Sequence, residues 1–227
     1  MAIQKNSKTI EERIILAINK LVKEEIEFFG ASRTDKGVHA LGQVASFKTN
    51  CSIPIENIPK VLNGMLPDDI VIKSAEEMSE DFNARFSSVG KKYIYKVVND
   101  NNPSAILRNH VYYYNKKLDY NNMQEACKCF IGTHDFETFR NTGGAAKTTI
   151  RTINQCELIK NGDLIELHIS GDGFLYNMIR IIMGTIIEVG IGNIRAEQID
   201  EIIQSKNRKK AGKTAPAHGL YLSEVLY

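Results

Sequence analysis

The pattern of hydrophobic and polar residues predicts helices separated by groups of strands. Apolar residues recur at helical spacing over residues 10–22, and Thr9 with Glu12 forms a capping-box pattern at their start. Residues 93–98 instead alternate between two faces, which is typical of a half-buried strand. The same reasoning predicts helices over 55–65, 119–130, 174–189 and 195–205, and extended segments over 26–30, 42–50, 69–78, 81–100, 110–115, 150–159, 164–170 and 219–227.

These strands are not joined one for one by helices, so the order predicts an α+β fold with mostly antiparallel sheets. The elements follow a weakly similar order in the two halves of the chain, and a natural boundary falls near residues 85–92. We therefore expect two lobes, residues 1–88 and residues 89–227. A chain of 227 residues is long enough for two lobes of ordinary domain size.

Composition excludes few classes of protein but favours a cytoplasmic one. The net charge is only +2, and the four cysteines lack the spacing of a zinc site, which favours reduced thiols. The first residues show no apolar segment of a signal peptide, and polar residues interrupt the most apolar stretch, 174–190. We expect no membrane segment.

The stretch SRTDKGVHA, residues 32–40, raises the first chemical question. Asp35 stands between Arg33 and Lys36 in a loop between two expected strands. It is either part of an ordinary surface turn or a carboxylate placed to act on a substrate.

Arg180 raises the second question, because it lies in a helix with apolar residues on most sides. A buried guanidinium needs a partner, for which a carboxylate elsewhere in the chain is the expected candidate. Alternatively, Arg180 lies at the helix edge with its head group in water. The helix alone favours neither interpretation.

Basic and aromatic residues gather where RNA could bind. Tyr93 and Tyr95 follow Lys91 and Lys92, a combination suited to base stacking and phosphate pairing, although a half-buried strand with core tyrosines explains it as well. The basic run 206–213 is either a phosphate contact or a solvated helix end. The chain has no P-loop, no G-x-G-x-x-G and no metal-binding histidine pair, so we predict no metal, nucleotide or other cofactor.

Six colinear stretches together resemble the TruA family of tRNA pseudouridine synthases, over about residues 10–227. The R-T-D-x-G-V-H-A pattern is the most specific, and it is accompanied by the F-x-x-x-M-[IV]-R pattern of the apolar helix. The matching stretches are SRTDKGVHALGQVASF, LPDDIVI, DFNARFSSVGKKYIYKV, GTHDFETFR, GFLYNMIRIIMGTIIEVG and HGLYL.

The resemblance implies a pseudouridine synthase fold, with two lobes around a central cleft, and a role for five residues. Asp35 would be the catalytic nucleophile and Arg180 its ion-pair partner. Tyr93 would stack on the target uracil and could assist proton removal at C5. Leu220 would line the uracil pocket, and Arg33 would help hold the target base out of its stack. His39 is expected to shape the loop through hydrogen bonds.

The family acts on uridines 38, 39 and 40 of the tRNA anticodon stem-loop, and it works as a homodimer. The reaction requires no metal or nucleotide. The alternatives are a non-catalytic RNA-binding protein and, less well supported, a glycoside hydrolase, which would want a second carboxylate. Candidate phosphate contacts are Lys91, Lys92, Lys147, Arg151 and Lys209.

The match departs from the family at the start of the chain. Family members open with a strand and a YDGT…GWQ segment before the first helix, whereas this sequence starts at MAIQKNSKTIEERI and contains no tryptophan. Loss of a sheet strand would leave backbone groups unpaired. We therefore expect a shortened chain to keep the active-site residues but to fold or bind tRNA less well, unless another segment or a neighbouring chain fills the gap.

Overall fold

The computed structural model describes residues 9–227, which form two compact units. Unit 1 contains the described residues up to Lys36 and residues Gln43–Ser88, and unit 2 contains Gly37–Gly42 and Val89–Tyr227. The sequence predicts lobes over residues 1–88 and 89–227. The short segment Gly37–Gly42 differs from that expectation, because it contains a strand that pairs within unit 2.

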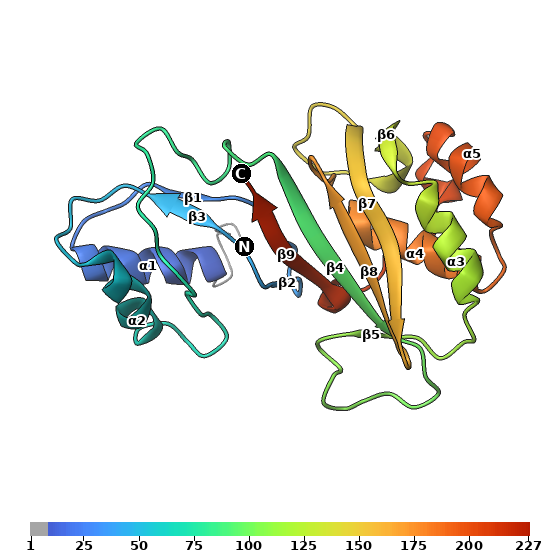
Figure 1. Cartoon of the computed structure of the whole chain (residues 1–227), viewed down its shortest axis with the longest axis horizontal. Coiled ribbons are helices and arrows are strands. Elements are labelled where there is room, and N and C mark those ends of the chain that lie inside the picture. Colours follow the sequence, from blue (N-terminus) through green and yellow to red (C-terminus); the bar gives the residue numbers. More distant parts are fainter. Residues whose placement is uncertain (1–8) are drawn as a thin grey trace. The chain divides into compact units, whose positions relative to one another are not determined.

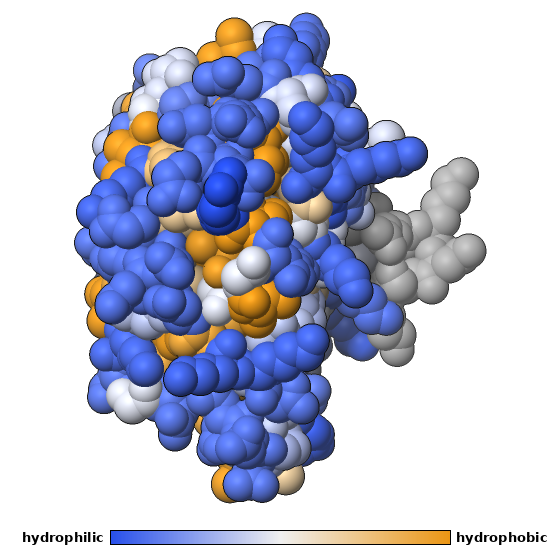
Figure 2. Space-filling view, turned by 90° about the vertical axis from the view of Figure 1, so that its right-hand side faces the viewer, coloured by the Kyte–Doolittle hydropathy of each residue, from blue (hydrophilic) through white to orange (hydrophobic). Residues whose placement is uncertain are grey.

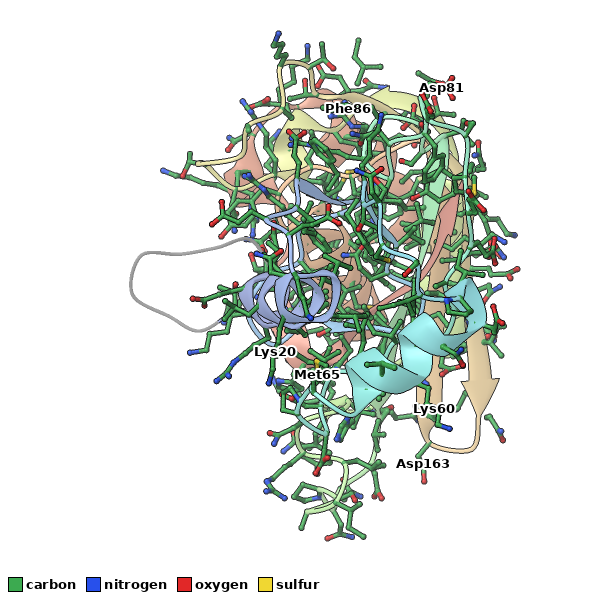
Figure 3. All side chains as sticks on the ribbon, turned by 90° about the vertical axis from the view of Figure 1, so that its left-hand side faces the viewer. Lys20, Lys60, Met65, Asp81, Phe86 and Asp163 are labelled. Atoms are coloured by element: carbon green, nitrogen blue, oxygen red, sulfur yellow. The ribbon has the colours of Figure 1, made fainter. Side chains whose placement is uncertain are left out.

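Unit 1 is a small helical layer with a two-stranded antiparallel sheet. The predicted capping box is confirmed, since the backbone N–H of Glu12 donates to Thr9 Oγ1 at 3.2 Å and the backbone N–H of Thr9 donates to Glu12 Oε2 at 3.4 Å. Polar residues such as Lys20 and Lys60 extend to solvent from its two α-helices (Figure 3). Its elements are α1 (Ile10–Val22), β1 (Phe28–Gly30), β3 (Ala45–Phe47), the 3₁₀ turn Ile55–Asn57 and α2 (Ile58–Asn63).

Unit 2 is built on a seven-stranded sheet in which most neighbours run antiparallel (Figure 1). The strand order is β2-β9-β4-β8-β7-β6, and β5 also pairs with β4; only the β2–β9 and β4–β5 pairs are parallel. The α+β prediction is therefore confirmed. The strands are β2 (His39–Ala40), β4 (Gly90–Val98), β5 (Tyr112–Tyr113), β6 (Gly132–Asp135), β7 (Ile150–Asn161), β8 (Leu164–Gly171) and β9 (Leu220–Leu226).

Three α-helices complete unit 2: α3 (Tyr120–Lys128), α4 (Met178–Gly190) and α5 (Ile199–Gln204). Helix α3 packs against α4 and β7, and nearly every side chain of α4 is buried. The face that carries α3 and α5 has hydrophobic surface surrounded by hydrophilic residues (Figure 2). Helix α4 is thus the central helix of the unit, as its apolar sequence predicts. Short 3₁₀ turns cover Phe136–Phe139, Ala196–Gln198, Arg208–Lys210 and Ala217–Gly219.

The strand predicted over residues 69–78 does not form. The backbone of Ile72 is instead satisfied by one side chain, because its N–H donates to Asn63 Oδ1 at 2.7 Å and its C=O accepts from Asn63 Nδ2 at 2.9 Å. Val71 and Met78 are 66% and 51% exposed. The segment has an apolar pattern but no neighbouring strand, and the extended stretch expected from residue 81 begins only at Gly90.

The hairpin between β7 and β8 turns one residue later than predicted. Asn161 pairs with Leu164, so the two loop residues are Gly162 and Asp163 rather than Asn161 and Gly162. Gly162 has φ +60°, which the mirror-image hairpin turns require at their first central position.

No helix within residues 9–227 is long and apolar enough to cross a membrane.

Candidate active site

The loop that carries Asp35 is closed at its base by backbone and side-chain hydrogen bonds within unit 1. The N–H of Ala31 donates to Val44 O at 2.9 Å, and Gln43 Nε2 donates to Ser32 O at 2.7 Å. Arg33 is exposed and Asp35 is partly exposed. These contacts fix the start of the loop directly after β1.

The loop leads into β2, which is held in unit 2 by pairing and stacking. His39 stacks on Tyr221 with ring centroids 4.7 Å apart, and its Nε2 is 2.8 Å from Asn109 O. A Cβ at Gly42 would lie 2.3 Å from Ser223 O, so only glycine allows this approach. His39 therefore helps to anchor the loop, in agreement with the expected structural role.

Arg180 lies in the first turn of α4, and two neutral oxygens hold its guanidinium. Its Nε donates to Ala215 O at 2.7 Å, and its Nη1 donates to Asn177 Oδ1 at 2.7 Å. The side chain is half-buried. The head group is thus bound by protein atoms and does not simply extend into water.

A segment that follows α5, residues 212–216, runs along α4 and supplies one of these oxygens. The N–H of Ala215 donates to Arg180 O at 3.0 Å, and the N–H of Gly212 donates to Thr185 Oγ1 at 2.9 Å. The approach is so close that a Cβ at Gly184 would lie 1.7 Å from Lys213 O. Helix α4 and this segment therefore position Arg180 together.

Tyr95 connects the same segment to the sheet. This fully buried residue donates its hydroxyl to Pro216 O at 2.6 Å. Burial raises the pKa of Tyr95 far above its usual value, and the positive charge of Arg180 offsets part of that rise, so the hydroxyl stays protonated and donates. Leu220, at the start of β9, pairs with Tyr95 and is 7% exposed. The structure thus connects Arg180, Tyr95 and Leu220 through residues 215–220.

Tyr93 lies two residues earlier on β4, beside a β-bulge between Lys92 and Tyr93. It is 7% exposed, and its ring meets Phe174 edge to face with centroids 5.3 Å apart. Tyr93, Tyr95 and Val97 share the buried face, as the alternation predicts. Bulges often re-aim side chains next to active sites, but stacking of Tyr93 on uracil stays a prediction.

The candidate phosphate contacts in unit 2 differ in what they already bind. Lys92 pairs with Glu224 at 2.7 Å, and the side chain of Arg151, near the start of β7, folds back onto the preceding loop, where its Nη1 donates to Thr148 O at 3.1 Å. Lys147 and Lys209 are exposed. Lys92 and Arg151 would have to exchange these contacts to reach a phosphate.

The carboxylate partner expected for Arg180 stays a prediction, and two other residues that bind its guanidinium were not predicted from the sequence. The structure shows an amide from Asn177 and a carbonyl from Ala215. Asparagine just before an apolar helix is a signal for Asn177, because asparagine favours helix starts. No local signal identifies Ala215, which lies 35 positions from its partner.

No group of three or more histidine, cysteine, aspartate and glutamate side chains in residues 9–227 is arranged to hold a metal ion. Among the thiols, a hydrogen bond with Cys127 and burial raise the pKa of Cys156 well above its usual value. Both cysteines are buried and serve as small apolar core residues.

Comparison with known protein families identifies the class of protein. A family model described as tRNA pseudouridine synthase matches residues 2–87 and 126–227. The chain belongs to the tRNA pseudouridine synthase family, whose members are isomerases.

Relatives of similar length show the same relationship along nearly the whole chain. The chain is 54% identical to tRNA pseudouridine synthase A of Acetivibrio thermocellus over 224 residues, which cover 99% of this chain and 92% of the relative. It is 52% identical over 223 residues to tRNA pseudouridine synthase A 2 of Clostridium tetani, covering 98% and 90% of the two chains. The protein of the same name from Clostridium perfringens is 49% identical over 219 residues, covering 96% and 90%.

Proposed function

We propose that this protein converts uridine to pseudouridine at positions 38, 39 and 40 of the tRNA anticodon stem-loop, with Asp35 as the nucleophile. The observation that carries the proposal is the family match, which includes both the Asp35 motif and the helix that holds Arg180. Family membership supports the reaction type. The stem-loop positions and the role of Asp35 rest on the resemblance of the R-T-D-x-G-V-H-A motif.

The reaction breaks the N1–C1′ glycosidic bond and joins C5 of the base to C1′, while C5 loses a proton and N1 gains one. There is no net oxidation or reduction. An ionised Asp35 would attack either C1′ of the ribose or C6 of the base, as a carboxylate nucleophile does in other covalent mechanisms. Pairing with Arg180 would favour the ionised carboxylate.

Three other residues would prepare the uridine. Tyr93 would stack on the uracil and assist proton removal at C5, Leu220 would contact the base in an apolar pocket, and Arg33 would hold the flipped base out of the stack. Flipping costs a few kcal/mol, least in a loop or at a weak stem end, and stacking offsets part of that cost.

The connection between the motif and unit 2 supports the role of Asp35. Asp35 precedes His39 by four residues, and His39 pairs with Tyr221, the neighbour of Leu220. Four residues span at most about 14 Å. The chain itself therefore limits how far the Cα atom of Asp35 can lie from β2, whatever the arrangement of the two units.

Lysine and arginine side chains would bind the tRNA backbone. Their contacts with phosphates make affinity fall as salt concentration rises. The proposed set is Lys91, Lys92, Lys147, Arg151 and Lys209.

We also propose a cytoplasmic homodimer, in which one tRNA contacts both protomers. Sedimentation of the free protein and of the tRNA complex tests the assembly. A monomeric complex with one tRNA would contradict it.

A tritium-release assay on tRNA that contains 5-tritiated uridine tests the function. The wild-type protein should release tritium, and Asp35→Asn, which keeps the size of the side chain, should release none. Asp69→Asn, which changes an exposed aspartate of the same unit, should behave as wild type. Mapping the product should find pseudouridine at positions 38–40.

Other results would point elsewhere. Equal tRNA binding by wild type and Asp35→Asn, with no release by either, would favour a non-catalytic RNA-binding protein. Release by Asp35→Asn at the wild-type rate would remove Asp35 from the mechanism.

A further inference from the structure

Asn177 has an unusual backbone for a residue at the start of a helix. Its φ and ψ are 62° and 8°, in the left-handed region that glycine adopts most easily. Only two other residues with side chains have positive φ among residues 9–227, and these are Lys23 and Lys206. Asparagine tolerates this region better than most residues, but glycine would fit it with less strain.

The side chain of Asn177 does not cap the helix. No hydrogen bond joins it to the first N–H groups of α4, although that is the common use of asparagine at this position. Its Oδ1 instead accepts from Nη1 of Arg180 at 2.7 Å. The side chain of Asn177, which strains a left-handed backbone, thus binds Arg180 and does not cap α4.

The guanidinium of Arg180 is held at two of its groups by oxygens from different parts of unit 2. Nε donates to Ala215 O and Nη1 to Asn177 Oδ1, both at 2.7 Å. The guanidinium is a rigid plane with five N–H donors. Two such bonds, one at Nε and one at Nη1, restrict the rotation of that plane about the side-chain bonds, and loss of the bond at Nη1 would weaken this restriction.

We propose that Asn177 is a positioning residue, which orients the guanidinium of Arg180 for its pairing with the catalytic carboxylate. This inference rests on the proposed function, in which Arg180 pairs with Asp35. The amide is neutral, so it aligns the guanidinium without cancelling its charge. It therefore affects turnover through Arg180 and not by contact with the uridine.

Asn177→Gly separates this role from a structural one. Glycine keeps the left-handed backbone and removes only the side-chain acceptor, so the unfolding temperature should stay the same or rise. The kcat for tritium release should fall by about 10- to 100-fold, a range typical of a small misplacement of a catalytic group. The KM for tRNA should change by less than about twofold, since no contact with the RNA is lost.

Lys23→Gly is the matched control, because Lys23 also has a positive φ and its side chain is exposed at the end of α1. It should leave kcat and KM as in wild type. A fall in kcat equal to that of Asn177→Gly would overturn the inference, and so would wild-type kcat in Asn177→Gly.

A second test asks whether the effect passes through Arg180. In an Arg180→Lys background, Asn177→Gly should lower kcat by less than about twofold, because an ammonium group has no plane to orient and coupled residues are not additive. The same 10- to 100-fold loss in both backgrounds would show that Asn177 acts by another route.

Nitrogen-15 NMR of the arginine side chains keeps the inference testable without turnover. Hindered rotation should give separate Nη–H signals for Arg180 in the wild-type protein, assigned with Arg180→Lys, and these should merge in Asn177→Gly. Unchanged signals in Asn177→Gly would refute the orientation of the Arg180 guanidinium by Asn177. If wild type releases no tritium while the signals behave as expected, the proposed function fails and the orientation by Asn177 stands.

Discussion

Gly184→Ala should disrupt the packing that holds Arg180, although alanine usually strengthens a helix. Gly184 lies in the buried interior of α4, and a Cβ there would come within 1.7 Å of Lys213 O and 2.9 Å of Lys213 C. The obstacle is backbone and cannot rotate away. Segment 212–216 would have to move by more than 1 Å to restore an ordinary contact of about 3.4 Å.

The size of the effect follows from three contributions to the free energy of unfolding. Replacing a helical glycine by alanine stabilises by about 1 kcal/mol. Overpacking costs about 1–3 kcal/mol. Displacement of the segment breaks the Ala215–Arg180 and Gly212–Thr185 hydrogen bonds, at about 1 kcal/mol each. The net loss is about 2–4 kcal/mol, which lowers the unfolding temperature by roughly 4–16 °C in a chain of this size.

Urea and thermal unfolding followed by circular dichroism measure this loss. Gly64→Ala is the control, because Gly64 has an ordinary helical φ of −73° and a Cβ there would meet its nearest neighbour at 3.4 Å. It should be neutral or slightly stabilising. If Gly184→Ala is as stable as wild type within about 0.5 kcal/mol, the close approach of the segment to α4 is not as the structure shows.

Three further predictions concern single contacts. Tyr95→Phe removes the donor to Pro216 O and should cost about 1–2 kcal/mol in urea unfolding, and an unchanged midpoint would contradict the bond. Asp119→Ala removes the cap of α3, where Asp119 Oδ1 accepts from Asn122 N, and should cost about 1 kcal/mol, whereas Asp119→Asn should cost little. Burial and then the charges of His39 and Arg180 lower the pKa of His218 in the folded state. His218 therefore adds stability that is fully present above about pH 6.5 and is lost as the pH falls through its lower folded-state pKa. His218→Asn should therefore make the decline in stability below about pH 6.5 less steep. An equally steep decline would refute this prediction.

The elements that the sequence predicted well are those set by neighbouring residues. The alternation in β4 reproduces its burial pattern, and the Thr9–Glu12 capping box starts α1 as expected. Both signals extend over a few residues and depend on local geometry. The central position of α4 also follows from its composition, because a helix that is apolar on most sides has to be buried.

The failures concern partners that are distant in sequence. Residues 69–78 carry an apolar pattern suited to a strand, but a strand needs a neighbour, and here the backbone of Ile72 binds the side chain of Asn63. Strand β2 was not predicted, although it does have a neighbouring strand. Its two residues are too few to show an alternation of apolar and polar positions, and only pairing with β9 defines them as a strand. The Arg180–Ala215 bond is likewise invisible to any local pattern.

The structure adds to the sequence prediction of a carboxylate partner for Arg180, because it shows two neutral groups that bind the guanidinium. Ala215 O and Asn177 Oδ1 are neutral acceptors, so they orient the guanidinium and leave its positive charge uncompensated by these two bonds. The two acceptors set the orientation of the guanidinium, and Arg180 itself supplies the positive charge. A substitution can therefore change one of these properties without the other. Asn177→Gly alters the orientation and keeps the charge and shape, whereas Arg180→Lys keeps the charge and removes the plane. If pairing with Asp35 needed charge alone, Arg180→Lys would retain most of the turnover and Asn177→Gly nearly all of it. A large loss in both would show that the direction of the guanidinium matters as much as its charge.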